Sequence, residues 1–194
     1  MVPKGSIVDF DSWLSELPGL LDAFDATRIR LFIASCCERQ LPNYMAFSQE
    51  VSWGHPVVLQ EARDILWRLN ETPSTTYLNS IQAQLKNATP DTEDFSSALT
   101  SAALDAAISL QEAIEYLIDG NTAHCITICG LIRDTIQMYL EQENLLTVAE
   151  LEIKELDKQR ADLETLAEIP ELTPNLVGLF RRCSIHNGKG NLDL

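Results

Sequence analysis

Basic residues are scarce in this 194-residue sequence, which has 14 lysines and arginines against 29 aspartates and glutamates, a formal net charge of −15. Nucleic-acid phosphates and anionic membrane surfaces attract clusters of Lys and Arg, so the composition argues against both kinds of partner. An acidic surface keeps a protein soluble, and it also speeds the encounter with a basic partner. Solubility and binding to a basic protein are therefore both open interpretations of the charge.

Long apolar runs and paired cysteine motifs are also missing. No apolar stretch approaches the roughly 18 residues of a membrane-spanning helix, and no basic-then-apolar leader is recognisable. The five cysteines are an odd number, and none belongs to a Cys-x-x-Cys motif, whereas disulfide-bonded secreted domains carry even sets. These features predict a cytoplasmic protein with free thiols.

Motifs that bind cofactors or metals are absent too. The glycines are scattered, so no phosphate-binding loop is formed, and the Glu-x-x-His spacing of di-iron bundles does not occur. Zinc would require His124, Cys125, Cys129, Cys183 and His186 to converge, but Cys125 and Cys129 fall on an apolar helical stripe. The sequence therefore predicts no cofactor, no metal and no catalytic residue, which favours a protein that is not an enzyme.

Helical periodicity is what the sequence does contain. Apolar side chains recur every three or four residues, most clearly in the long helix predicted over residues 95–118. Gly120 predicts a glycine cap at the end of that helix. No segment shows the alternation that is typical of a strand. The pattern predicts an all-α protein, a single-domain bundle of about seven to eight antiparallel helices over residues 1–183, followed by a disordered tail over residues 184–194.

The segment 29–47 has the most unusual composition. Its apolar residues fall on nearly every side of a helix from Ile29 to Leu41, and a helix that is apolar all round is normally buried. Cys36 and Cys37 are then expected to be core residues, because free cysteine is among the most buried residue types. We expect this helix to end before Pro42, since proline disfavours the α conformation in the residue before it.

Polar residues gather around that proline. Glu38 and Arg39 precede it, and Asn43 and Tyr44 follow it. A buried charge costs several kcal/mol unless it is paired, so these side chains either lock the corner as a structural network or expose one end of the helix to a ligand. The structural interpretation is the simpler one for Glu38 and Arg39, and the ligand interpretation stays open beside it.

A second set of candidate residues is acidic. No Lys or Arg occurs between Lys86 and Arg133, whereas seven carboxylates do. They are Asp91, Glu93, Asp94, Asp105, Glu112, Glu115 and Asp119. On a helical wheel Asp105 joins Glu112 and Glu115 on the outer ridge of the predicted helix, although its apolar flanks also make it a candidate for the polar corner. The other six form a candidate face for a basic protein partner, or an ordinary solvated surface.

One run of residues resembles a known family. Cys37-Glu38-Arg39-Gln40-Leu41-Pro42-Asn43-Tyr44-x-x-Phe47 is similar to the signature Cys-Glu-Arg-x-x-Pro-Asn-Tyr-x-x-Phe of the YjaG-like bacterial family, Domain of Unknown Function 416. Ile65-Leu66-Trp67, the stretch 103–106 and the stretch 135–141 follow its pattern in the same order, while the turn at Gly54-His55-Pro56 departs from the expected Gly-Asp type. The resemblance implies a small cytosolic helical bundle with no established activity, and it points to Glu38, Arg39, Asn43, Tyr44 and Asp105.

Two classes of function follow from these observations. The preferred hypothesis is a non-enzymatic bundle that binds another protein, expected to be basic, through the acidic face in an immunity-type or adaptor role. The alternative is a small-ligand binder or enzyme with a pocket at the corner formed by Glu38, Arg39, Pro42, Asn43 and Tyr44. Both a monomer and a homodimer are compatible with either hypothesis.

Overall fold

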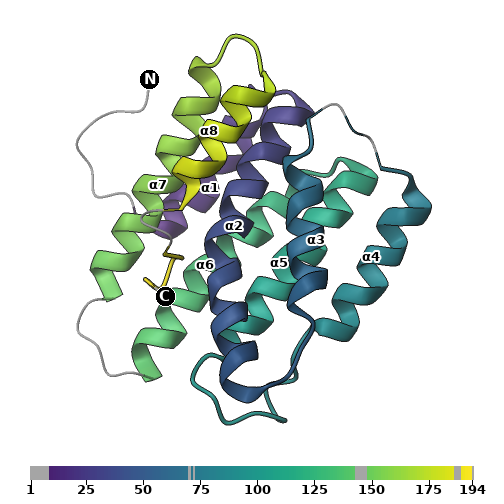
Figure 1. Ribbon diagram of the computed structural model, residues 1–194. Helices are drawn as coiled ribbons and strands as arrows, with labels where there is room; N and C mark the ends of the chain where they lie inside the picture. Colours follow the sequence, from purple (N-terminus) through teal and green to yellow (C-terminus); the bar gives the residue numbers. More distant parts are fainter. Residues whose placement is uncertain (1–8, 70, 72, 143–147, 186–188, 194) are drawn as a thin grey trace.

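The computed structural model describes residues 9–69, 71, 73–142, 148–185 and 189–193. Over these residues the chain forms eight α-helices (Figure 1). They are α1 (Phe10–Leu21), α2 (Ala26–Val51), α3 (Pro56–Trp67), α4 (Thr75–Ala88), α5 (Thr100–Asp119), α6 (Ala123–Gln142), α7 (Val148–Glu168) and α8 (Pro174–Ser184). This is the all-α, single-domain bundle that the sequence predicts. None of the helices in the described part is long and apolar enough to cross a membrane.

The helix α2 is the centre of the bundle. It contacts α3, α5, α6, α7 and α8, and in Figure 1 it runs through the middle of the view with α3 on one side and α7 and α8 on the other. The prediction of a buried helix is confirmed, because Leu31, Phe32, Ile33 and Cys36 have no exposed surface. The side chain of Asp25 accepts a hydrogen bond from the amide of Arg28 and caps the first turn.

The helix α2 runs through Pro42 without ending, so the prediction of a break before this proline was wrong. A proline inside a helix has no N–H for the carbonyl four residues earlier, here Glu38, and costs about 3 kcal/mol. The helix tolerates this cost because tertiary packing, rather than local propensity, supplies most helical stability in proteins. The chain that we expected to turn at Pro42 instead continues to Val51 and ends at Ser52, whose φ is 52°.

The helix α5 begins at Thr100 instead of residue 95. Phe95 lies before it, in an aromatic cluster with ring centroids 5.2 Å from Phe47 and 5.0 Å from Trp53. At the other end Gly120, with a φ of 71°, is the left-handed cap that the sequence predicts. The predicted apolar stripe of this helix is confirmed, but Phe95 belongs to the preceding loop and packs that loop against the core.

The C-terminal segment, which we define as residues 189–193, lies against α2. The Asn191 amide donates to the carbonyl of Arg39 at 3.0 Å, and Leu192 is buried. A Cβ at Gly190 would lie 2.5 Å from the Arg39 carbonyl oxygen and 3.2 Å from the Pro42 ring, so only glycine permits this approach. The prediction of disorder does not hold for these five residues, because they supply hydrogen bonds and apolar contacts to α2; residues 186–188 and 194 lie outside the described part of the chain.

Candidate functional site

Glu38 connects three helices. Its carboxylate accepts hydrogen bonds from Arg63 Nη1 and Trp67 Nε1 on α3, both at 2.7 Å, and from Arg181 Nε on α8 at 3.1 Å. Its side chain is only 8% exposed. A buried carboxylate with two arginine partners is compensated in charge and hydrogen bonding, so Glu38 acts as a structural junction of α2, α3 and α8.

Arg39 connects α2 to α7. Its guanidinium donates to Glu155 Oε1 at 2.7 Å and Oε2 at 2.9 Å, and to Asp162 Oδ2 at 2.8 Å and Ser35 Oγ at 2.7 Å. Burial alone would lower the pKa of Arg39, but the carboxylates of Glu155 and Asp162 raise that pKa well above its ordinary value. Arg39 therefore stays charged, and its donors are committed to the protein.

Asn43 and Tyr44 also make internal contacts. Asn43 Nδ2 donates to Asn191 Oδ1 at 2.9 Å, which holds the C-terminal segment. The Tyr44 hydroxyl donates to the carbonyl of Ala88 at 2.6 Å and accepts from the His55 amide at 3.1 Å. Tyr44 thus fixes the turn before α3 to the end of α4.

Asp105 is buried, which corrects its predicted place on an outer ridge. It is 8% exposed, and its carboxylate accepts from Thr135 Oγ1 on α6 at 2.7 Å. Asp105 therefore faces α6, one of the helices against which α5 packs. Burial raises the pKa of Asp105 from 3.8 to about 6, and the hydrogen bond from Thr135 opposes that increase. Glu38, Arg39, Tyr44 and Asp105 therefore contact different neighbouring helices, and they do not converge on one cavity.

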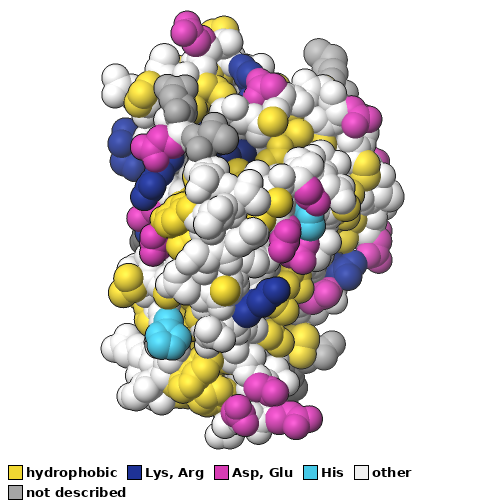
Figure 2. Space-filling view, turned by 90° about the vertical axis from the view of Figure 1, so that its right-hand side faces the viewer, with side chains coloured by type: hydrophobic (Ala, Val, Ile, Leu, Met, Phe, Trp, Pro, Cys, Tyr) yellow, Lys and Arg dark blue, Asp and Glu magenta, His cyan; other side chains and the backbone are white. Residues whose placement is uncertain are grey.

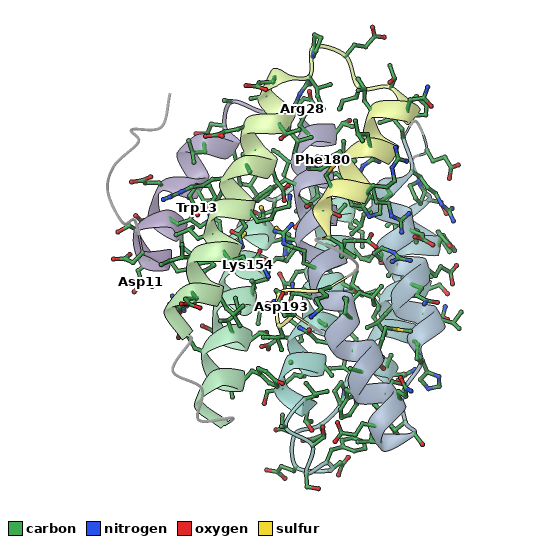
Figure 3. The ribbon with its side chains drawn as sticks, turned by 60° about the vertical axis from the view of Figure 1, so that its left-hand side comes forward. Asp11, Trp13, Arg28, Lys154, Phe180 and Asp193 are labelled. Atoms are coloured by element: carbon green, nitrogen blue, oxygen red, sulfur yellow. The ribbon has the colours of Figure 1, made fainter. Side chains whose placement is uncertain are left out.

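One cavity does open at the Arg39 corner, between α2, α7 and the C-terminal segment. We call it the Arg39 pocket. It has a volume of about 270 Å³ and is lined by Arg39, Leu151, Lys154, Glu155, Lys158, Ser184, Lys189, Gly190 and Asn191. Figure 3 shows Lys154 of α7 and Asp193 of the C-terminal segment close together on this side of the molecule, in agreement with their ion pair.

Several polar groups of the Arg39 pocket have few partners. Lys154 pairs with Asp193, and Lys158 pairs with Asp162. Lys189 makes no ion pair with any other described residue, and Asn191 Nδ2 is buried without a hydrogen-bond partner in the described part of the chain. These residues could not be identified from the sequence, because lysines on an amphipathic helix resemble solvent-facing residues and the Gly/Asn-rich tail resembles a disordered segment. No local pattern marks them.

The predicted acidic face is divided. Asp91, Glu93 and Asp94 are exposed in the connection before α5, whereas Asp119 lies at the far end of that helix. The helix has 20 residues and is about 30 Å long at 1.5 Å per residue. Figure 2 likewise shows acidic side chains in separate groups on this face. The six residues therefore form two clusters instead of one continuous surface.

The cluster near the end of α5 has internal partners. His124 contacts Glu112 at 2.7 Å and Asp119 at 3.2 Å, and Glu115 accepts from Gln82 Nε2 at 2.8 Å. Partial burial would lower the pKa of His124, but the hydrogen bonds to Glu112 and Asp119 raise it. In contrast, the side chains of Asp91, Glu93 and Asp94 make no ion pair with any described residue.

The cysteines are core residues, as predicted, except for Cys183. Cys36, Cys37, Cys125 and Cys129 are buried, and Cys183 is exposed. Burial raises the pKa of Cys36 and Cys37 well above the ordinary value, so neither is a reactive thiolate. Among the described residues, which exclude His186, no three His, Cys, Asp or Glu side chains are placed to hold a metal ion.

Fold and site together define a single-domain, all-helical protein in which the most conspicuous charged residues tie the central helix to its neighbours. The chain belongs to the family described as "Protein of unknown function (DUF416)", whose model matches residues 20–194. The resemblance read from the run around Pro42 is thereby confirmed.

Individual relatives agree with this assignment. The "Uncharacterized protein YjaG" of Escherichia coli is 26% identical over 141 residues, which cover 72% of this chain and 65% of that protein. An uncharacterised protein of Haemophilus influenzae is 27% identical over 146 residues, which cover 73% of this chain and 74% of that protein. The chain thus spans somewhat less than two thirds of the E. coli relative. The crystal structure of a DUF416 family protein from Shewanella baltica shares the fold, with a TM-score of 0.80 and 24% identity over 91% of this chain and 96% of that one.

Proposed function

We propose that this protein binds a small molecule in the Arg39 pocket. The observation that carries the proposal is the meeting of a cavity with two under-partnered polar groups, Lys189 and the side-chain Nδ2 of Asn191, at the corner that bears the family signature. Its volume of about 270 Å³ is close to the lower end of the range for small-molecule sites, about 300–1,000 Å³. A metabolite-sized ligand fits this space, whereas a folded partner does not.

The role of Arg39 in this proposal is to hold the wall of the pocket. Its donors are used by Glu155, Asp162 and Ser35, so it fixes α7 relative to α2. The opposite wall is the C-terminal segment, held by the hydrogen bonds of Asn191 to Arg39 and Asn43. The signature residues thus shape the pocket, and residues outside the signature contact the ligand.

The test is a ligand-observed NMR screen of small metabolite-like compounds against three chains. Leu151→Trp fills the pocket, because Leu151 lines it. Ile153→Trp is the matched control, since Ile153 lies on the same helix, is 48% exposed and does not line the pocket. We expect compounds that bind the wild-type protein and Ile153→Trp but not Leu151→Trp. The proposal is wrong if no compound binds the wild-type chain, or if Leu151→Trp retains every binder.

A second candidate function is binding to a basic protein, in an adaptor or immunity-type role. It is supported by Asp91, Glu93 and Asp94, which are exposed and lack ion pairs with described residues. Unneutralised carboxylates favour encounter with a positively charged surface. A cytoplasmic setting suits both candidates, because all five cysteines are free.

The protein-binding candidate is tested by neutralising the three loop carboxylates together with Asp91→Asn, Glu93→Gln and Asp94→Asn. The control neutralises three exposed carboxylates elsewhere, at Glu16, Glu168 and Glu171. The protein-binding candidate would be supported by a basic cytosolic partner that dissociates as salt increases. This partner should be lost with the loop variant and retained by the control. Equal retention by both variants would exclude the loop as the contact.

A further inference from the structure

The charge of the Arg39 pocket is opposite to that of the whole chain. Four of the 14 basic residues line it, and Glu155 is the one carboxylate among the lining residues. The chain as a whole has a formal charge of −15. A concave site that gathers positive charge on an acidic protein raises the local concentration of anions.

Not all of these charges are available to a ligand. Arg39 and Glu155 neutralise each other through a bidentate contact, and both side chains are at most 5% exposed. Lys158 is paired with Asp162 on the same helix. The remaining groups are the ammonium of Lys189 and the Nδ2 of Asn191, a residue that is 94% buried. Both are hydrogen-bond donors. The buried Nδ2 of Asn191 requires an acceptor, and the ammonium of Lys189, which is an exposed residue, is available to one.

The C-terminal segment itself shows which kind of acceptor this pocket takes. The carboxylate of Asp193 contacts the ammonium of Lys154, and Asp193 has a φ of 59°, in the left-handed region that non-glycine residues rarely adopt. The pair is weak because the two side chains are 47% and 43% exposed. An incoming anion can therefore replace Asp193 at Lys154 at little cost.

The remaining wall is apolar. Leu151, Lys154 and Lys158 line the pocket, and a lysine side chain offers an apolar methylene stem below its ammonium. An inorganic ion alone would leave this wall uncovered. A short apolar body attached to an anionic group would cover it.

We infer that the ligand of the Arg39 pocket is a small organic anion, with a carboxylate or phosphate head group bound by Lys189, Lys154 and Asn191 Nδ2 and a short apolar body against Leu151. This inference rests on the proposed function, and it names the chemical class of the ligand. Carboxylate and phosphate head groups share a negative charge and oxygen acceptors, and these are the features that the pocket's donors recognise.

Titration calorimetry at low and high salt tests the inference with defined probes. The carboxylate arm uses hexanoate and succinate, the phosphate arm uses glycerol phosphate and inorganic phosphate, and hexanamide and hexylamine are the neutral and cationic counterparts. We expect one organic anion or more to bind, binding to weaken as salt increases, and hexanamide and hexylamine not to bind. The stronger arm identifies the head group.

Variants locate the anion. Lys189→Gln should weaken its binding about tenfold, and Asp193→Asn should strengthen it about threefold because a competing carboxylate is removed. Lys86→Gln, which removes an exposed charge on α4, is the matched control and should change nothing. The anion inference would be overturned if the compounds that bind were neutral or cationic, if Leu151→Trp abolished their binding, and if Lys189→Gln did not change it. The proposed function would then still stand. A chain that binds no compound of any charge would remove both.

Discussion

Two regions beside α2 differ in how completely their polar groups are satisfied. Glu38 and Arg39 are buried, and each contacts at least two oppositely charged residues. The Arg39 pocket next to them contains the half-exposed Lys154. It also contains Lys189 and the Nδ2 of Asn191, for which the described residues provide no ion pair and no hydrogen-bond acceptor, respectively. The first region stabilises the bundle, and the second is the one that we propose to bind a ligand. On this proposal, residues that stand out in a sequence serve the fold, while their inconspicuous neighbours serve a ligand.

The largest effect is expected where charges are buried. Arg39→Ala would leave the carboxylate of Glu155 buried without its cation and would take from Asp162 one of its two cations, since Lys158 remains. Breaking such a buried pair costs about 3–5 kcal/mol. Urea unfolding followed by circular dichroism would measure this loss of unfolding free energy. A loss below about 1 kcal/mol would show that the Arg39 network is not structural and would remove the contrast between the two regions.

Asp105 is a buried carboxylate that forms no ion pair with any described residue, and its removal should stabilise the protein. Burial raises its pKa from 3.8 to about 6, so between these values the folded protein holds a proton that the unfolded chain releases. Stability then falls as pH rises through this window. Asp105→Asn keeps an acceptor for Thr135 and should be more stable than wild type by about 2 kcal/mol at neutral pH.

The pH dependence supplies the control for Asp105. The stability advantage of Asp105→Asn should shrink as pH falls towards the ordinary carboxyl pKa, where both chains carry a neutral side chain at this position. Asp157→Asn, which changes an exposed carboxylate on α7, should show no such advantage. Thermal unfolding of the three chains across the acidic range distinguishes these outcomes. A variant less stable than wild type at neutral pH would contradict the assignment.

A moderate effect is expected at the wall of the pocket. Gly190→Ala would place a Cβ 2.5 Å from the Arg39 carbonyl oxygen, so the C-terminal segment must move, at a cost of about 1–3 kcal/mol. Hydrogen exchange should show lost protection of the Asn191 amide, and ligand binding should weaken. Gly178→Ala is the control, because its nearest neighbour would be 3.8 Å away, at the end of the Arg182 side chain. Unchanged protection in Gly190→Ala would mean that the segment is held in another way.

The smallest effect on stability is expected at the rim. Lys154→Gln breaks an ion pair whose side chains are 47% and 43% exposed, and such pairs contribute about 0–1 kcal/mol. Urea unfolding should therefore hardly change, while calorimetry should show weaker binding of the organic anion. Several kcal/mol of lost stability would place Lys154 with Arg39 among the structural charges.

Local sequence patterns predicted what depends on local physics. The helical periodicity predicted the all-α fold, and Gly120 predicted the end of α5. The apolar run around Cys36 and Cys37 predicted that both thiols are buried. The passage of α2 through Pro42 could not be predicted, because it depends on packing by five other helices.

The candidate site was harder to predict than the fold. The signature residues Glu38, Arg39, Asn43 and Tyr44 were found, but not their partners, which are far away in the sequence. The burial of Asp105 depends on α6, and the pocket depends on a segment whose composition resembles a loose tail. These features arise from tertiary contacts, which no local pattern encodes.

The separation in sequence between α2 and its charged partners has a consequence for protein synthesis. Glu155 and Asp162 lie 116 and 123 residues after Arg39, and Asn191 lies 148 residues after Asn43. At about 5–20 residues per second, Arg39 is synthesised roughly 6–25 s before the carboxylates that neutralise it. During that interval the guanidinium favours water over burial, so the central helix cannot take its final place early. The N-terminal half of this bundle therefore waits for α7 before its core can close.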